Sequence, residues 1–307
     1  MDTGTAVLVE DDRLTELVDT DAAVELLGTG ATWAEGPLWL PERDAVLWSD
    51  IPGNRILCWE ARTGTVSVER AEAEFTNGRT LDLTGRVVTC SHGRRAVERT
   101  EPDGDTHVLV DHFGAARLNS PNDVVVAADG AIWFTDPPYG ITLPQEGHPG
   151  EREYEGCYVF RFEPDTGRLD PVVTDMVEPN GLAFSPDESL LYVSDTALPL
   201  RFDGEGGRIL VYDVVDDRCR DGRLFARVDP GVSDGFRVDV LGNVWTSSKD
   251  SIQVFAPDGH RLGKIPMPEK TSNLCFGGPD HDTLFITAST GLYRLRTRVQ
   301  GCRPGRA

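Results

Sequence analysis

The chain repeats short segments in which an oxygen-bearing side chain opens an apolar, strand-like run. The first of them reads Glu35-Gly36-Pro37-Leu38-Trp39. Each of the six opening residues has a side-chain oxygen that could bind a metal, and none is positively charged. They are Glu35, Asn77, Asn122, Asn180, Asp234 and Asn273. Carboxylate and amide oxygens are the ligands that hard divalent cations prefer, whereas zinc favours histidine and cysteine. If the fold brings these residues together, they predict a divalent-cation site.

A second apolar and aromatic run follows each opening residue after a turn, and it ends in Ser or Thr and often Asp. Clear examples are Leu47-Trp48-Ser49-Asp50, Ile132-Trp133-Phe134-Thr135-Asp136 and Leu191-Tyr192-Val193-Ser194-Asp195. Turn signals such as Pro-Asp-Gly at 102–104 and 257–259 separate the runs, and helical periodicity is nearly absent. These patterns predict an all-β protein built of hairpins.

The hairpin units recur at a regular spacing. The opening residues are separated by 42, 45, 58, 54 and 39 residues, a range typical of four-stranded propeller blades. The sixth unit runs out of chain before its fourth strand, and Val24–Leu27, ahead of the first unit, can supply that strand. The sequence therefore predicts a six-bladed β-propeller with four-stranded blades, whose ring is closed by an N-terminal strand pairing with the last blade. A two-sheet sandwich is the alternative.

The predicted propeller is a single domain over residues 21–300. Residues 1–20 form an N-terminal extension, and residues 301–307 form a C-terminal tail. Residues 137–156, rich in proline and glycine, are expected to form a long loop within the third unit. That loop is either a lid over the central pocket or an ordinary surface loop.

The first strand of each propeller blade lines the central channel, so the opening residues should converge at one end of it. Two carboxylates, Glu35 and Asp234, would repel each other there, and buried amides would need partners. One divalent cation meets both needs, and calcium accepts the irregular oxygen shell that a channel offers. Magnesium, manganese and zinc are alternatives. Turn formation is the competing explanation for the Asn-Gly pairs, and it is weakest for Glu35 because glutamate is a poor turn residue.

Several motifs resemble those of the gluconolactonase family, which includes senescence marker protein (regucalcin), and most closely its bacterial gluconolactonase branch. The match covers about residues 24–296. The motifs are Trp33-Ala34-Glu35-Gly36-Pro37-Leu38-Trp39, Ser120-Pro121-Asn122-Asp123-Val124, Ile132-Trp133-Phe134-Thr135-Asp136-Pro137-Pro138-Tyr139-Gly140, Pro179-Asn180-Gly181-Leu182-Ala183 and Asp234-Gly235-Phe236-Arg237-Val238.

The resemblance implies hydrolysis of sugar lactones or related esters by a carboxylic ester hydrolase. It also implies calcium, or another divalent ion, on four of the opening residues: Glu35, Asn122, Asn180 and Asp234. Asn77 and Asn273 then become candidates for substrate binding in the pocket wall. Animal members carry an arginine two residues before the position of Asn122, where this chain has Ser120, so their substrate preference does not carry over.

Three residues are candidates for roles in the reaction. Asp234 could act as the general base toward water, provided that it binds the ion through one oxygen, while the ion polarises the carbonyl. His92, in Cys90-Ser91-His92-Gly93, could orient substrate or carry a proton near neutral pH, with a hydrogen-bonded or surface histidine as the alternative. Tyr139, in the 137–156 loop, is a candidate substrate contact.

Other functions are compatible with the same motifs. They include a metal-dependent organophosphate or other ester hydrolase, a metal-dependent lyase or isomerase in a biosynthetic pathway, and a non-catalytic interaction propeller with a structural metal. The sequence contains no GxSxG motif and no phosphate-cradling glycine loop, which disfavours serine-hydrolase and nucleotide chemistry.

Composition narrows the partners and the compartment. The net charge of −21 disfavours binding to nucleic acid or anionic membranes. The six cysteines are scattered without CxxC spacing, which indicates free thiols in a reducing compartment. We find no apolar signal segment and no run near the roughly 18 apolar residues of a membrane helix. We therefore expect a cytoplasmic enzyme that acts on a small molecule, with its oligomeric state left open.

Overall fold

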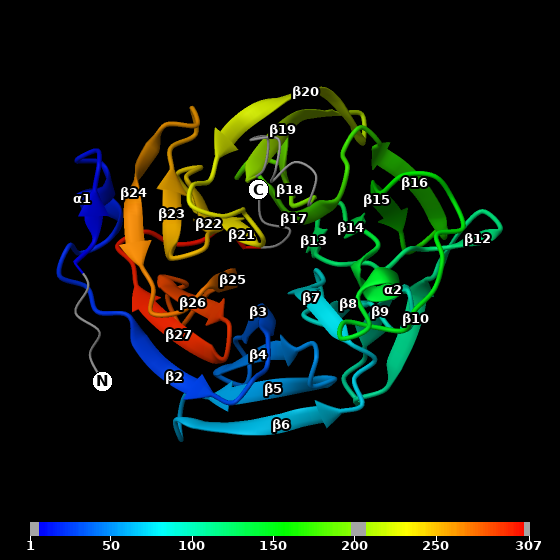
Figure 1. The fold of residues 1–307 in the computed structure, drawn as a ribbon, viewed down its shortest axis with the longest axis horizontal. Coiled ribbons are helices and arrows are strands. Elements are labelled where there is room, and N and C mark those ends of the chain that lie inside the picture. Colours follow the sequence, from blue (N-terminus) through cyan, green and yellow to red (C-terminus); the bar gives the residue numbers. More distant parts are fainter. Residues whose placement is uncertain (1–5, 198–206, 304–307) are drawn as a thin grey trace.

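Six antiparallel sheets surround a central channel in the computed structural model, which describes residues 6–197 and 207–303 (Figure 1). Each sheet is built mainly of strands that are consecutive in the chain, as the alternation of apolar runs and turn signals indicates. The predicted six-bladed propeller is confirmed. Residues 1–5 of the predicted extension and 304–307 of the predicted tail lie outside the described residues.

The blades follow chain order, and each begins with its innermost strand. The first holds β3 (Ala34–Leu40), β4 (Ala45–Asp50), β5 (Arg55–Glu60) and β6 (Thr65–Ala71). The second holds β7 (Thr76–Leu81), β8 (Val87–Ser91), β9 (Ala96–Thr100) and β10 (Thr106–Val110). The third holds β13 (Val124–Val126), β14 (Ile132–Asp136), β15 (Tyr158–Glu163) and β16 (Arg168–Val173).

The remaining three blades complete the ring. The fourth holds β17 (Pro179–Phe184), β18 (Leu190–Asp195), β19 (Arg208–Val215) and β20 (Arg218–Arg227). The fifth holds β21 (Phe236–Val238), β22 (Val244–Ser247), β23 (Ser251–Phe255) and β24 (Arg261–Pro266). The sixth holds β25 (Thr271–Gly277), β26 (Thr283–Ala288), β27 (Gly291–Arg296) and β2 (Glu25–Thr29).

The ring closes between the two ends of the chain. Strand β2 pairs antiparallel with β27, so Leu26 lies opposite Tyr293 and the N-terminal strand becomes the outer strand of the last blade. This pairing confirms the predicted closure. It also covers two sheet edges that would otherwise present unpaired backbone groups.

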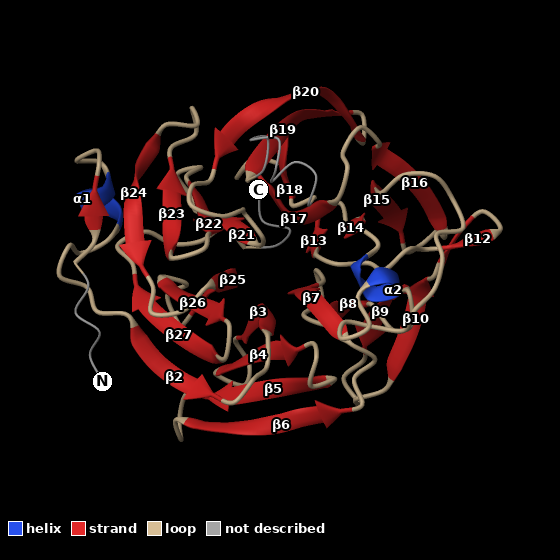
Figure 2. Ribbon diagram, viewed as in Figure 1, coloured by secondary structure: helices blue, strands red, loops and turns tan. Residues whose placement is uncertain are grey.

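Two short helices and one small hairpin complete the described structure (Figure 2). The helix α1 (Leu14–Leu17) lies in the N-terminal extension, and α2 (Tyr139–Thr142) lies in the long connection between β14 and β15. Strands β11 (His112–Phe113) and β12 (Ala116–Arg117) form the hairpin.

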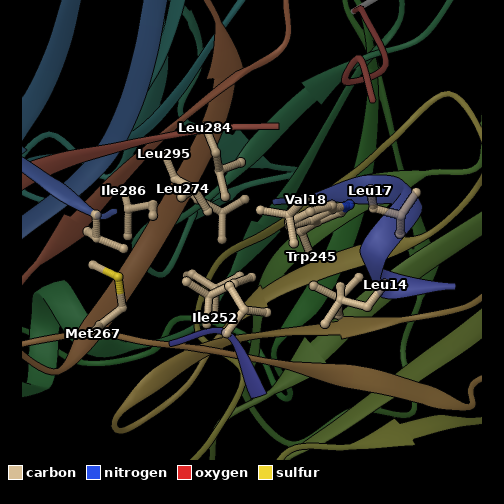
Figure 3. Packing of buried hydrophobic residues seen from close by; sticks show 14 of the residues in the cluster. Leu14, Leu17, Val18, Trp245, Ile252, Met267, Leu274, Leu284, Ile286 and Leu295 are labelled. Carbon is tan, nitrogen blue, oxygen red and sulfur yellow. The ribbon is translucent and has the colours of Figure 1, made fainter. Parts of the chain in front are cut away.

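The described part of the N-terminal extension packs on the fifth blade. Strand β1 (Leu8–Val9) pairs with the outer strand β24. Figure 3 shows Leu14, Leu17 and Val18 beside Trp245 and Ile252, in one buried cluster that continues into the sixth blade. Full burial of each such aliphatic side chain contributes about 1.5–3 kcal/mol. The extension therefore covers apolar surface that the two blades would otherwise expose.

Glycines allow the innermost strands of neighbouring blades to approach closely. A Cβ on Gly36 would lie 2.2 Å from the carbonyl oxygen of Asn77, and a Cβ on Gly181 would lie 2.4 Å from that of Asp234. Gly181 N also donates a 3.0 Å hydrogen bond to Asp234 O. Because any larger residue would push the strands apart, both glycines serve contact between blades, and Gly36 in addition adopts a positive φ of 52°.

Candidate functional site

The opening residues lie where the innermost strands begin, at one end of the channel. Four belong to β3, β7, β17 and β25, whose pairing register shifts beside them, and two precede β13 and β21 by two residues. Such bulges redirect side chains out of the regular alternation of a strand. Five of the six side chains are buried, and Asp234 is half-buried.

Glu35 is held by two hydrogen bonds and lies near a second carboxylate. Its Oε2 accepts from Gly36 N at 2.9 Å and from Asn273 Nδ2 at 3.2 Å. Burial is the main cause that raises the pKa of Glu35 well above its ordinary value, and the charge of Asp234 is the next. Holding a charged, buried carboxylate beside a half-buried one is costly, so this end of the channel favours a bound cation.

Both the nitrogen and the oxygen of the Asn273 side-chain amide form hydrogen bonds within the protein. Its Nδ2 donates to Glu35, and its Oδ1 accepts from Leu274 N at 2.8 Å. The structure thus places Asn273 against the predicted metal ligand, and its predicted contact with substrate stays a prediction.

The imidazole ring of His92 contacts two side-chain amides on one side and the long connection between β14 and β15 on the other. Its Nδ1 lies 3.1 Å from Glu146 O, and its Nε2 lies 3.5 Å from Asn77 Nδ2 and 3.4 Å from Asn122 Nδ2. An amide nitrogen only donates, so Nε2 must accept and Nδ1 must carry the proton. Burial lowers the pKa of His92 to about 4. A neutral, fixed imidazole favours the orienting role over proton transfer.

The amide nitrogens of the candidate ligands point at protein partners. Asn122 Nδ2 contacts His92, and Asn180 Nδ2 donates to Thr196 Oγ1 at 3.2 Å. Among the described residues, neither Oδ1 atom has a hydrogen-bond partner. Both amides therefore keep an oxygen available as a ligand. Thr196 has no role in the sequence-based prediction, although it directly follows the Ser-Asp ending of a second strand.

The donor set is composed of oxygen. The described residues contain no group of three or more His, Cys, Asp or Glu side chains that could hold a metal. The candidate centre instead combines the carboxylates of Glu35 and Asp234 with the amides of Asn122 and Asn180. Oxygen donors of this kind fit calcium or magnesium better than zinc.

The connection over residues 137–156, called the strap below, is attached to this end of the channel. Tyr139 Oη lies 2.6 Å from Thr196 Oγ1. Ser120 Oγ accepts from Gly140 N at 2.9 Å and donates to Pro137 O at 2.6 Å. Ser120 is thus buried and holds the strap.

Glu146 of the strap is a candidate site residue that the sequence reasoning missed. Burial, and next the charge of Asp234, raises the pKa of Glu146 to about 7, while Lys270 acts in the opposite direction. Glu146 O lies 3.1 Å from His92 Nδ1, which places Glu146 at the end of the channel that carries the opening residues. The repeat could not reveal it, because the strap is an insertion with no counterpart in the other blades.

A cavity of about 780 Å³ opens at the opposite end of the channel. It is lined by turns between first and second strands, including Leu83 and Pro186, and by none of the six opening residues. Between the two ends, Arg237 Nη1 lies 3.3 Å from Asp123 Oδ2. The candidate centre and this cavity are therefore separate regions of the channel.

The predicted free thiols agree with the structure. All six cysteines are unpaired; Cys58, Cys90, Cys157 and Cys275 are buried, and Cys219 and Cys302 are partly buried. Within the described residues, no helix has the length and apolar character needed to cross a membrane.

Comparison with known proteins identifies the family. Residues 33–290 match the family described as SMP-30/Gluconolactonase/LRE-like region. The chain belongs to the SMP-30/gluconolactonase family. This confirms the resemblance seen in the motifs.

Members of the SMP-30/gluconolactonase family resemble this chain over most of its length. A gluconolactonase from Zymomonas mobilis is 34% identical, with 94% of this chain and 85% of the relative covered. Pentonolactonase XacC from Haloferax volcanii is 26% identical, with 87% and 84% covered. The structure of a gluconolactonase from Xanthomonas campestris superimposes with a TM-score of 0.89 and 41% identity, over 95% of both chains.

Proposed function

We propose that this protein hydrolyses a sugar lactone at the end of the channel that carries Glu35 and Asp234. Family membership and the lactonases among its relatives support the reaction class. The observation that carries the site is the burial of Glu35 close to a second carboxylate, Asp234, which raises the pKa of Glu35. Such perturbed groups concentrate at functional sites.

One divalent cation completes the proposed site, with calcium preferred over magnesium, manganese and zinc. Glu35, Asn122, Asn180 and Asp234 would hold it through oxygen atoms. When bound, the cation supplies Lewis-acid polarisation of the lactone carbonyl. Asn273 keeps Glu35 oriented, and His92 keeps the amide of Asn122 oriented.

Asp234 is the proposed general base. It is half-buried, so water can reach its carboxylate. It would accept a proton as water adds to the carbonyl carbon, after which the bond from that carbon to the ring oxygen breaks. The ring oxygen then takes up a proton, and we assign its delivery to Glu146, whose pKa is raised to about 7. The product is the open-chain hydroxy acid.

Substrate contacts are proposed around this centre. Asn77 lies beside Asn122 through their shared partner His92, and Tyr139 lies beside Asn180 through Thr196. These positions support the proposal that both residues contact hydroxyl groups of a sugar ring. Asn273 remains a third candidate, although its amide already contacts Glu35.

A panel of aldonolactones followed by a pH indicator tests this function. Chelated protein should lose turnover, calcium should restore it, and Asp234→Ala should lower kcat at least about 100-fold. Glu42→Ala, which removes an exposed carboxylate far from the site, is the matched control. Turnover that survives both chelation and loss of Asp234 would refute the mechanism. Calcium-dependent stabilisation without turnover of any lactone would favour the lyase or interaction alternatives.

A further inference from the structure

Three buried aspartates end the second strands of the blades that carry three of the proposed metal ligands. They are Asp50 at the end of β4, Asp136 at the end of β14 and Asp195 at the end of β18. Each is fully buried. None touches the proposed ligand of its own blade through a hydrogen bond, yet each binds the segment that leads to it.

The same hydrogen-bond pattern recurs in these blades. In the third blade, Asn119 N and Ser120 N donate to Asp136 at 2.7 and 2.8 Å. These donors lie three and two residues before Asn122. The carboxylate therefore fixes the backbone from which the amide of Asn122 projects.

The other two blades repeat this spacing. Thr32 N and Trp33 N donate to Asp50 at 2.8 and 3.2 Å, three and two residues before Glu35. Val177 N and Glu178 N donate to Asp195, both at 3.1 Å, three and two residues before Asn180.

Each aspartate also accepts a hydrogen bond from one side chain, which differs between blades, while Gly53 N and Ala197 N add longer bonds to Asp50 and Asp195 at 3.4 and 3.3 Å. Arg55 Nε donates to Asp50 at 3.0 Å, and Arg208 Nη2 donates to Asp195 at 2.9 Å. In the third blade Tyr154 Oη of the strap donates to Asp136 instead. Asp136 thus connects the strap to the segment that carries Asn122.

The remaining blades lack this aspartate. The equivalent second-strand positions hold Ser91, Ser248 and Ala288. The second blade shows a different local structure, in which Glu74 and Phe75 adopt positive φ angles of 53° and 51° and Phe75 N donates to Asn54 Oδ1. The aspartate therefore accompanies three of the four proposed ligands, Glu35, Asn122 and Asn180, and is not a general feature of a blade.

We propose that Asp50, Asp136 and Asp195 are positioning residues for metal binding, which rests on the proposed function. A carboxylate that accepts two successive backbone N–H groups fixes their peptide planes, and so fixes the direction of the ligand two residues later. Groups that orient metal ligands commonly change metal affinity about 10- to 100-fold when they are lost. The three aspartates should act in this way on calcium.

Calcium affinity of the full chain, measured by titration calorimetry with calcium chloride after chelation, tests the proposal. Asp136→Asn and Asp195→Asn should each weaken calcium about 10- to 100-fold, because their two N–H donors bind different carboxylate oxygens. Asp50→Asn should be milder than Asp50→Ala, because both donors there bind the single atom Oδ1.

Asp239→Asn is the matched control. Asp239 is fully buried and accepts from Leu241 N, Asn243 N and Trp245 Nε1 at 2.9 Å each, but it holds the β21–β22 turn. This variant should lower the melting temperature of the chelated protein and leave calcium affinity unchanged.

The outcomes separate the two proposals. If the control loses as much calcium affinity as the variants, or if the variants lose none, the positioning role is wrong. A wild-type chain that binds no calcium would overturn the metal centre itself, and the positioning role with it. Should Asp136→Asn fail to fold, Tyr154→Phe should still weaken calcium about two- to tenfold by removing one bond to that carboxylate. Unchanged affinity in that variant would overturn the role of Asp136.

Discussion

Asn273 in the last blade donates a hydrogen bond of 3.2 Å to Glu35 in the first blade. The two residues are 238 positions apart and meet where the ring closes. Closure of the propeller therefore also orients a proposed metal ligand. Stability of the ring and geometry of the site are linked through this contact.

Asn273→Ala tests that link. Without the Nδ2 donor, the Glu35 carboxylate loses one of its two hydrogen bonds, so its charged form becomes less favourable. Calcium affinity should fall about tenfold, while the circular dichroism spectrum stays that of a β-propeller. Calorimetric titration with calcium measures the loss. An affinity equal to that of the wild type would show that Asn273 does not orient Glu35.

Calcium should flatten the pH dependence of stability. Burial and Asp234 raise the pKa of Glu35 above its ordinary value of 4.5, so the folded chelated protein holds a proton that the unfolded chain has released. Its melting temperature should therefore fall as the pH rises from about 5 to 8. Calcium competes with that proton, so stabilisation by calcium should grow over the same range.

Glu35→Gln isolates the contribution of Glu35 to this pH dependence. Because glutamine does not titrate, the fall in melting temperature of the chelated protein should become shallower. Other buried acids, such as Asp136 and Glu146 with pKa values raised to about 7, leave a residual slope of the same sign. A slope identical to that of the wild type would contradict the assignment.

His92→Ala should weaken calcium about 10- to 100-fold, because Asn77 and Asn122 lose their common acceptor. The variant should not alter the pH profile of kcat near neutrality, since His92 is neutral there. His281→Ala is the control. Burial also lowers the pKa of His281 to about 4, but it contacts Cys302 O near the opposite cavity. If the pH profile of kcat loses an ionisation near neutral pH in His92→Ala but not in His281→Ala, proton transfer by His92 would be supported instead.

Gly181→Ala should damage both stability and activity. The added Cβ would lie 2.4 Å from Asp234 O, so the fourth and fifth blades must separate at the proposed base. We expect a loss of about 1–3 kcal/mol in the free energy of unfolding, measured by urea titration, and a lower kcat. Gly150→Ala, whose Cβ would make an ordinary 3.5 Å contact with Ile141, should change neither. Equal behaviour of the two variants would argue against close blade contact.

Much of this architecture could be predicted because it repeats. Each blade must bury the same two faces, so apolar runs and turns recur, and the opening residues recur with them at the start of each innermost strand. Even the closing strand β2 was predictable, because the sixth unit lacked its fourth strand.

Features outside the repeat were not predictable. Glu146 and Tyr154 lie in the strap, which has no counterpart in other blades, so no periodic signal marks them. The docking of Leu14 and Val18 depends on apolar surface exposed by blades far away in the sequence. The neutral state of His92 follows from burial and from two amides that only the folded chain brings together.

Calcium stoichiometry is the most direct test of the central claim. Equilibrium dialysis of the chelated wild-type chain against calcium should show one bound ion per chain, with no binding to a variant that combines Glu35→Gln and Asp234→Asn. The exposed carboxylate variant Glu42→Gln should bind as the wild type does. Binding of one ion by the double variant with unchanged affinity, or no binding by the wild type, would contradict the proposed metal centre.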